Sequence, residues 1–499
     1  MSVPVIGLVL MPLCLLLLRR PAGLLALLLL AGAFPAGAAV IFGGLGVQPA
    51  LVPALAFMTY AGMQRLLGAR YPGDTAARAL YTPFVLTTAW AVVGSLVMPR
   101  LFMDRVWVWP QKNDGVAAQV LLAPNFGNIS QDLYLVLDVA LMVLAAGYLT
   151  RPDIRIDRLY RAYLWTGWVV FGLCVWQMAH RLAGVPFPDD VLYSNPGWSI
   201  LSGQMAGPVP RINASFSEPA ACASFLSGIL YSTTWVVLQG YRLPMARLLL
   251  PASAIGLLFT TSTTGFATVA VGLCLLPLAA MATGSLRLAG RVVRLAIIGT
   301  AVACFGVLIV AAVAPNVVPA AQIVIESTEN KGDSQSYKER SMADTDALTV
   351  AAQTYGLGAG WGSVRASSLV PSLLSTVGVV GVVGLLVFDW CLLRGAMAAR
   401  RVVPPCPERL VIDGCLPALS GRMIAALFSG PTIGTADFYL LMAMVIAATA
   451  RITVFRARIG AADARAFAMQ GARTPPPEMG PGLGGAVAFH RYGIDIKRA

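Results

Sequence analysis

Long runs of apolar residues, separated by short polar segments, occupy most of this chain. A helix needs about 20 apolar residues to cross a bilayer, and the sequence contains thirteen runs near that length. They lie at 3–18, 22–42, 46–66, 79–98, 132–149, 160–178, 219–239, 248–263, 265–283, 295–314, 367–392, 410–428 and 433–450. The pattern predicts an all-α, polytopic transmembrane helical bundle of 12–13 spans, in which 3–18 is short and 410–428 contains a charged residue, Arg422.

The composition supports a lipid environment. Of the 499 residues, 57% are hydrophobic and 12% are charged, whereas a soluble domain has about 25% charged residues. This excludes a soluble enzyme, a disordered chain and a fibrous repeat. The net charge of +13 does not predict nucleic-acid binding, because the Lys and Arg residues form short clusters between apolar runs rather than one patch.

The distribution of basic residues predicts the orientation. One set of short loops holds 18 Lys or Arg residues, and the alternate, longer loops hold nine. The positive-inside rule therefore predicts an outer N-terminus and an inner C-terminus. Residues 1–451 would form the membrane domain, with outer loops at about 99–131, 179–218 and 315–366. Residues 452–499, which are basic and rich in Pro and Gly, would form a flexible cytoplasmic tail.

The second outer loop ends in a group of residues with chemical interest. Arg211 is followed by Phe216, Glu218 and Pro219, and a helix should begin there because Pro suits the first helical turn. Arg binds phosphate through two parallel hydrogen bonds, and Glu is a candidate base. The alternative interpretation is a simple helix start with an interfacial Arg.

The third outer loop contains a predicted helix from about Tyr337 to Thr354. Ser336 and Glu339 have the spacing of a capping box. Tyr337, Arg340 and Asp344 have the spacing i, i+3, i+7, which puts them on one helical face. Lys338 would add positive charge nearby. The alternative interpretation is a solvated amphipathic helix.

Glycines at every second position from Gly356 to Gly362 follow this helix. We expect a turn whose backbone approaches a ligand closely. Trp361 offers a flat face to a sugar ring or to the membrane interface, and Arg365 adds charge before the next span. A flexible turn is the alternative.

Three other polar features have weaker implications. The hydroxyl run 260–264 joins two spans, and we expect most of it to satisfy backbone groups in a tight hairpin. Asp138 lies mid-span and needs a polar partner, for which Arg422 is a candidate. No His, Cys and carboxylate cluster has metal-ligand spacing, so we expect no metal and no cofactor.

The order of these motifs resembles a known superfamily. An outer loop with Arg-x-x-x-x-Phe-x-Glu-Pro precedes a helical pair with a Ser/Thr-Gly turn. A large outer loop with Tyr-x-x-Arg and Gly-x-Gly-x-Gly then leads to a Gly-rich span. Over residues 205–392 this is similar to the O-antigen polymerases, exopolysaccharide polymerases and O-antigen ligases, which are integral membrane proteins of the bacterial inner membrane.

The resemblance implies a glycosyltransferase that uses a polyprenyl-diphosphate-linked oligosaccharide at the outer face of that membrane. Arg211 and Arg340 match the two arginines that would hold the diphosphate, without a metal. Glu218 is then the candidate base, ahead of Asp344 and Glu339. The remaining expected substrate contacts are Tyr337, Lys338, Asp344, Trp361 and Arg365. Inversion at the anomeric carbon is the family expectation.

Two alternative functions stay open at this stage. A ligase would transfer a finished glycan to a lipid or protein acceptor, but the large loop lacks the His common in that branch, so we favour a polymerase. A lipid-linked oligosaccharide flippase or other transporter would need charged groups at the membrane midplane, for which Asp138 and Arg422 are the clearest candidates. A chain-length regulator and a flippase are the expected protein partners.

Overall fold

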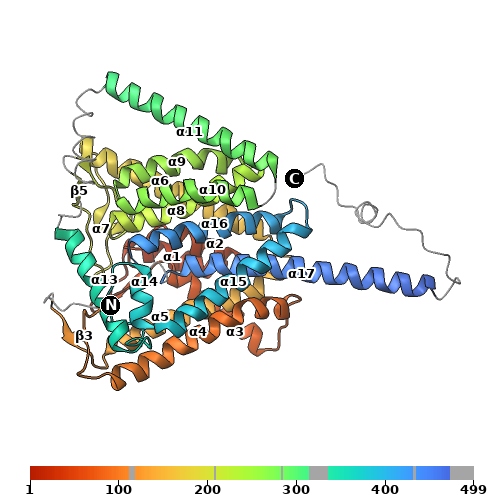
Figure 1. The fold of residues 1–499 in the computed structure, drawn as a ribbon, viewed down its shortest axis with the longest axis horizontal. Coiled ribbons are helices and arrows are strands. Elements are labelled where there is room, and N and C mark those ends of the chain that lie inside the picture. The colour runs from red at the N-terminus through yellow and green to blue at the C-terminus, as the bar shows by residue number, and fades with distance from the viewer. Residues whose placement is uncertain (112–117, 207–208, 283–284, 314–334, 431–433, 472–499) are drawn as a thin grey trace.

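The computed structural model describes residues 1–111, 118–206, 209–282, 285–313, 335–430 and 434–471. Within these ranges the chain is an all-α bundle whose helices mostly run side by side along one direction (Figure 1). The predicted fold class is therefore confirmed. The helices are α1 (Val5–Leu17), α2 (Pro21–Ala31), α3 (Leu51–Leu66), α4 (Asp74–Leu101), α5 (Phe126–Leu149), α6 (Ile156–Ala183), α7 (Asp189–Leu192), α8 (Pro219–Gln239), α9 (Pro244–Thr260), α10 (Thr263–Ala282), α11 (Leu286–Val313), α13 (Gln335–Gln353), α14 (Leu369–Thr376), α15 (Gly378–Val402), α16 (Pro407–Phe428) and α17 (Ala436–Gly471).

Strands occur in the described residues only as three short antiparallel hairpins. β1 (Val40–Phe42) pairs with β2 (Leu45–Val47), β3 (Trp107–Val108) with β4 (Val120–Leu121), and β5 (Met205–Ala206) with β6 (Val209–Pro210). All three lie in connections between helices, so they shape loops rather than the core.

Eight of the described helices are long and apolar enough to cross a membrane, fewer than the thirteen expected. These eight are α4, α5, α6, α8, α10, α15, α16 and α17, whereas α1, α2 and α9 are apolar but shorter. Two predicted spans are wrong in their bounds. The span 22–42 is only the short helix α2, because the chain leaves the helix after Ala31 and then forms β1. The span 367–392 is divided into α14 and α15, and the break coincides with a left-handed Gly378 (φ 67°).

The centre of the bundle is formed by α8, α16 and α17, which have the most buried apolar segments of the eight. Residues 439–448 of α17 are buried without interruption. Around this centre, α5 packs on α17, α9 on α8, and α15 on α4. The short α2 is also buried, between α3 and α6, with Leu24, Leu25 and Leu28 fully enclosed. These helices share one large cluster of buried apolar residues, and among the described residues two smaller clusters lie outside it.

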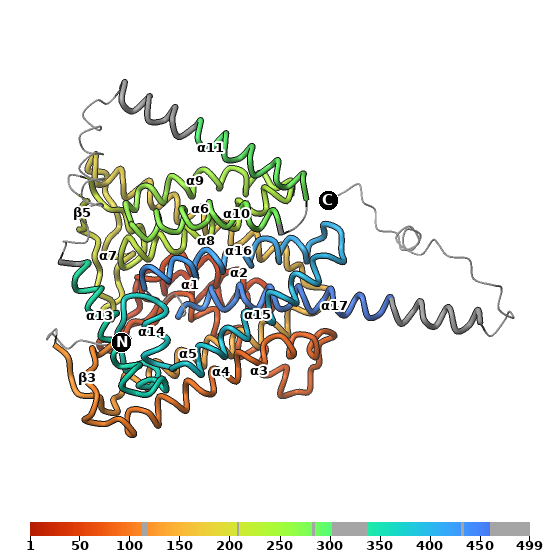
Figure 2. The backbone as a smooth tube through the Cα atoms, in the orientation of Figure 1, coloured from red at the N-terminus to blue at the C-terminus, as the bar shows by residue number. Residues whose placement is uncertain are grey.

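The segments from the three long loops lie at one end of the bundle, which we call the loop end. In Figure 1, β3, β5, α7, α13 and α14 all lie there, and Figure 2 shows the backbone returning to this end from distant parts of the sequence. α13 contacts β3 and α14. The grouping expected for the long loops is thus present in their described parts.

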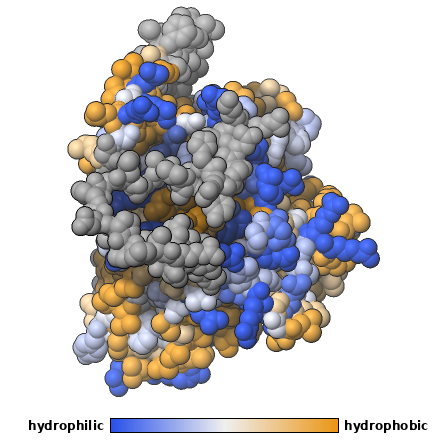
Figure 3. Space-filling view, turned by 90° about the vertical axis from the view of Figure 1, so that its right-hand side faces the viewer, coloured by the Kyte–Doolittle hydropathy of each residue, from blue (hydrophilic) through white to orange (hydrophobic). Residues whose placement is uncertain are grey.

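The basic connections lie at the opposite end, which we call the basic end. Exposed arginines occur in each short connection there, including Arg70, Arg158 and Arg242. Figure 3 looks at this end and shows hydrophilic residues gathered on its face, with apolar residues around much of the rim. α17 continues beyond the bundle here and extends to Gly471. The start of the expected flexible tail is therefore helical, and residues 472–499 lie outside the described part.

Candidate functional site

Arg211, Glu218 and Arg340, which come from two different loops, meet at the loop end. We call these three residues the outer-loop cluster. Nη2 of Arg340 lies 3.4 Å from Oε2 of Glu218, and both side chains are partly exposed. Arg211 interacts electrostatically with both of the others. The two arginines therefore share one site with a carboxylate, although Arg211 and Arg340 are far apart in sequence.

A polar anchor on α6 fixes the segment that carries Arg211 and Glu218. Oε1 of the buried Gln177 accepts hydrogen bonds from the backbone N–H groups of Asn213 and Ala214, at 3.1 and 2.7 Å. Its Nε2 donates to Oδ1 of Asn213 at 2.9 Å. The backbone N–H of Ile212 donates to the carbonyl of Phe259. The segment is thus held against α6 and α9, and Gln177 is a positioning residue that the sequence did not indicate.

Glu218 occupies the N-cap position of α8, and Pro219 begins the helix as predicted. The Glu218 side chain makes no capping hydrogen bond, so its carboxylate points to other partners, among them Arg340. The positive end of a helix dipole stabilises a carboxylate at this position.

α13 presents Arg340 from the other loop. This helix starts at Gln335, so it confirms the predicted helix but begins two residues early, and Ser336 lies inside it rather than at its N-cap. Ala347 and Val350 of α13 pack in a small core with Val108 and Leu122 of the β3–β4 hairpin. One turn after Arg340, Asp344 accepts hydrogen bonds from the backbone N–H groups of Ser367 and Ser368, at 2.7 and 3.0 Å.

These contacts indicate what Asp344 does in the fold. A second oxygen of its carboxylate accepts from the Ser368 hydroxyl at 2.7 Å, and Ser368 is the N-cap residue of α14. Asp344 therefore joins α13 to the start of α14 and keeps Arg340 in place. Its expected contact with substrate stays a prediction.

The environment of Arg211 favours an anion. Burial lowers the pKa of Arg211, the neighbouring Arg340 lowers it further, and Glu218 opposes this shift. The guanidinium still carries its charge at neutral pH, so the cluster has two positive groups and one negative group. Nε of Arg211 is buried and has no hydrogen-bond partner among the described residues. An anion with several oxygen atoms would satisfy this donor and offset the repulsion between the arginines.

A cavity of about 210 Å³ opens beside the cluster, and Glu218 lines it. The cavity is enclosed by the ends of α2 and α16, the N-termini of α8 and α17, and the residues before α3. The lining residues are Ala31, Gly32, Pro35, Gln48, Ala50, Trp198, Phe216, Ser217, Glu218, Ala221, Ser224, Phe225, Arg422, Ser429, Gly430, Thr435, Ala436 and Asp437. A hollow that is mostly apolar, with a few polar and charged groups in its lining, therefore lies beside the candidate base.

Arg422 in this cavity has a different partner from the one predicted. Its Nη1 donates to Oδ2 of Asp437 at 2.6 Å, and its Nη2 donates to Oγ1 of Thr435 at 2.9 Å. The suggested pairing of Arg422 with Asp138 is wrong. Asp437 is the second residue of α17. A carboxylate near the start of the last predicted span was therefore the sequence feature that could have indicated the partner of Arg422.

The glycine-rich turn at 356–362 has a structural explanation that differs from the predicted approach to a ligand. All four of its alternate glycines have left-handed backbones (φ 74° to 96°). A Cβ on Gly358 would lie 2.5 Å from the carbonyl oxygen of Thr376, and one on Gly360 would lie 3.0 Å from that of Gly94. The turn is thus pressed against α4 and the break between α14 and α15, which leaves no room for a side chain.

Gly358→Ala should therefore destabilise the fold. The Cβ would clash with the backbone at Thr376, and Ala would be held at φ 84°. A strained backbone of this kind costs about 1–3 kcal/mol, and the clash adds to it. Thermal unfolding of the purified protein in detergent measures the effect. Gly62→Ala in α3, where a Cβ meets nothing within 4 Å, is the matched control, and an equal melting temperature in both variants would contradict the assignment.

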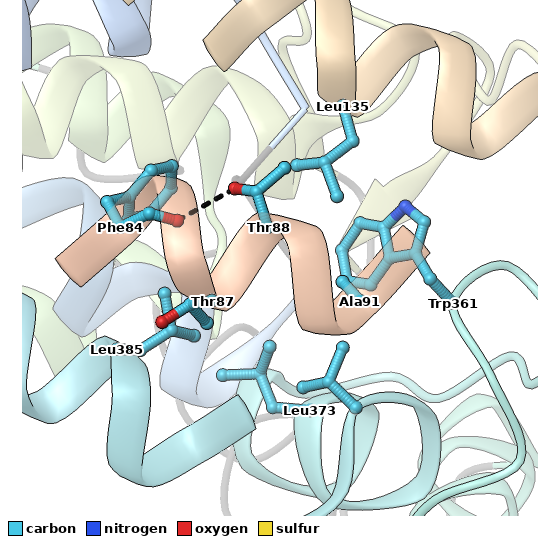
Figure 4. Close-up of a pocket in the computed structure, with 9 residues that line it drawn as sticks. Phe84, Thr87, Thr88, Ala91, Leu135, Trp361, Leu373 and Leu385 are labelled. Atoms are coloured by element: carbon cyan, nitrogen blue, oxygen red, sulfur yellow. Dashed lines mark hydrogen bonds between the residues drawn. The ribbon is translucent and has the colours of Figure 1, made fainter. Parts of the chain in front are cut away.

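Trp361 packs into the bundle at the loop end. Figure 4 shows its indole beside α4, facing Ala91, with Leu135 and Leu373 nearby. In the same view the hydroxyl of Thr88 donates to the carbonyl of Phe84 at 2.9 Å. The hollow between these residues is only about 30 Å³, which is room for about one water molecule. The indole acts as a packing group here, and stacking against a sugar stays an untested prediction.

The other predicted contacts lie on the surface near the cluster. Tyr337 and Lys338 are exposed on α13, and the Arg365 side chain is exposed while its backbone N–H donates to the carbonyl of Trp109. In the hydroxyl run, Oγ1 of Thr260 donates to Leu257 and accepts from the N–H of Ser262. These bonds match the expected role of that run in closing the α9–α10 hairpin.

The comparisons with known proteins give no relative. No family model matches the chain, and no curated protein matches it either. Among the described residues no group of three or more His, Cys, Asp or Glu side chains is placed to hold a metal ion. The functional assignment therefore depends on the chemistry of the outer-loop cluster and its cavity.

Proposed function

We propose that this protein is a polysaccharide polymerase, a membrane glycosyltransferase that joins polyprenyl-diphosphate-linked oligosaccharide repeat units at the periplasmic face of the bacterial inner membrane. The observation that supports it most is the convergence of Arg211 and Arg340 with Glu218, which also lines a cavity. The resemblance of the loop motifs to the O-antigen and exopolysaccharide polymerases supports the same assignment.

In this proposal the two arginines bind the diphosphate of the donor. Negative charge grows on the leaving diphosphate as the glycosidic bond breaks, and preorganised cations at that position lower the barrier. The forked guanidinium of Arg matches two phosphate oxygens at once. The unpartnered Nε of Arg211 would gain an acceptor when the donor binds.

Glu218 takes the proton of the acceptor hydroxyl. That oxygen then forms a bond to the anomeric carbon, and the electron pair of the breaking bond moves to the diphosphate oxygen. Without substrate, Glu218 is paired with Arg340. A diphosphate that binds Arg340 competes with this pair and releases the carboxylate, so binding of the donor would activate the base.

The decisive experiment uses the purified protein and lipid-linked repeat units isolated from membranes of its host. A ladder of products with increasing numbers of repeats supports the proposal. A host that lacks the protein should accumulate single repeat units. Long chains left on the carrier in that host would indicate a ligase instead, and loss of lipid-linked units from the outer leaflet would indicate a flippase.

We also expect polymerisation to resist chelators. If the arginines neutralise the diphosphate, EDTA should change the initial rate of ladder formation by less than about twofold, within the scatter of such measurements. The buffer should hold enough monovalent salt to keep the ionic strength constant, since it screens these charges. Complete inhibition that Mg²⁺ or Mn²⁺ reverses would overturn this expectation.

A further inference from the structure

We infer that the cavity lined by Arg422, Asp437 and Glu218 is a binding subsite for one uncharged sugar ring, that of the acceptor. The assignment of this sugar to the acceptor rests on the proposed function. The binding of a neutral sugar is independent of that function, because it follows from the chemistry of the cavity lining. The experiments below test the two claims separately.

The floor of the cavity is a buried ion pair with a donor to spare. Arg422 is 3% exposed and Asp437 is 5% exposed. Two of the guanidinium nitrogens bond to Asp437 and Thr435, but Nε of Arg422 is buried without a partner among the described residues. A buried polar group without a hydrogen bond costs about 1–3 kcal/mol. A ligand oxygen in the cavity would satisfy this donor.

The charges of the lining favour a neutral ligand. Arg422 is balanced by Asp437, and Glu218 at the mouth is balanced by Arg340. A phosphate placed here would face two carboxylates, which repel it. An apolar chain would leave Nε of Arg422 without a partner.

The remaining lining groups suit a ring rich in hydroxyl groups. Ser217, Thr435 and Gln48 contribute polar groups to a largely apolar lining, in which Trp198 and Phe216 offer aromatic surface to the face of a sugar ring. The volume of about 210 Å³ is several times the ~30 Å³ of one water molecule. It admits a single hexose and excludes a longer chain, which must continue out of the mouth past Glu218.

This placement has a consequence for the reaction. Glu218 belongs both to the cavity lining and to the outer-loop cluster. A ring seated on Arg422 and Asp437 would hold one hydroxyl at the Glu218 carboxylate, beside the arginines that would hold the donor diphosphate. The cavity therefore would select which sugar is extended, and the arginines would treat all donors alike.

The test is saturation-transfer NMR on the full chain in nanodiscs, with a panel of neutral methyl hexosides and methyl N-acetylhexosaminides as probes. We expect saturable binding of at least one glycoside. Ala221→Phe, which fills the cavity from α8, should weaken that binding at least tenfold. Thr435→Val keeps the side-chain volume but removes a hydroxyl, and it should weaken glycoside binding severalfold. This variant still tests the inference if Ala221→Phe fails to fold. Val370→Phe, on the exposed surface of α14 at the same end, should bind as the parent protein does.

Three results would overturn the inference. The first is that no glycoside binds, and the second is that Ala221→Phe binds the glycoside as tightly as the parent does. The third is that methyl phosphate displaces the sugar both from the parent and from Arg211→Lys, because the cavity itself would then bind an anion. Sugar binding without a product ladder would reject the proposed polymerase and retain the subsite. If Ala221→Phe forms a product ladder with an unchanged KM for the acceptor, the subsite is rejected and the polymerase is retained.

Discussion

Arg340→Lys and Arg211→Lys should each reduce chain elongation by at least about 10²-fold, the usual cost of removing one preorganised donor from a developing anion. Lys keeps the charge but loses the forked geometry that binds two phosphate oxygens. The loss should appear mainly in kcat, because the diphosphate carries more negative charge in the transition state than in the bound donor. The rate of ladder formation at saturating lipid-linked repeat unit measures it.

Arg105→Lys is the matched control for these variants. Arg105 is exposed in the loop before β3, at the same end of the bundle, and it should elongate chains at the parent rate. The loss of elongation rate in the double variant of Arg211 and Arg340 should be much smaller than the product of the two single losses. The reason is that the effects of residues that act on one group are not additive. Normal polymer from either single variant would reject the diphosphate clamp.

Glu218→Gln should lower kcat by about 10²–10⁴-fold, the range typical of a general base. Gln keeps the size of the side chain and a hydrogen-bond acceptor for Arg340, so membrane insertion and donor binding should persist. Single-turnover elongation measures the loss, and unchanged binding of the lipid-linked donor separates it from a structural effect.

Asp104→Asn provides the comparison for Glu218→Gln. Asp104 is an exposed carboxylate at the loop end with a left-handed backbone (φ 58°), which Asn tolerates. It should elongate chains at the parent rate. If Glu218→Gln also elongates chains at the parent rate, the base is another group, and Glu339 on α13 is the next candidate.

The sequence predicted those parts of the site that depend on local rules. The structure confirms Pro219 at a helix start, which follows from a short-range preference, and the helix around Arg340, although that helix does not begin at the predicted capping box. Their convergence was an expectation from resemblance, and the Arg340–Glu218 distance is consistent with it. Long-range features were harder. The partner of Arg422 depends on which helices face each other, and apolar periodicity does not determine that.

The glycine-rich turn shows a second limit. Alternate glycines indicate that a backbone approaches something closely, but the pattern is the same whether the neighbour is a ligand or another helix. Here the neighbours are Gly94 of α4 and Thr376 of α14. The broken span 22–42 has a similar cause. Its apolar composition continues past Ala31, but the segment after α2 is held by bonds to distant residues, such as that from the backbone N–H of Ala36 to the carbonyl of Ser215.

The α1–α2 pair has a consequence for the surrounding lipid. Ser2 and Ile41 form a β-bridge, so this hairpin starts and ends at the loop end. α1 has 13 residues and is thus about 20 Å long, against a hydrocarbon thickness of about 30 Å. Its leucines Leu15 and Leu16 face outward. This hydrophobic mismatch requires acyl chains beside α1 to compress, or Arg19 and Arg20 at the hairpin tip to snorkel toward the far leaflet. If the proposed donor is the substrate, a thinned annulus at this position would give its isoprenoid tail an easier lateral path to the protein.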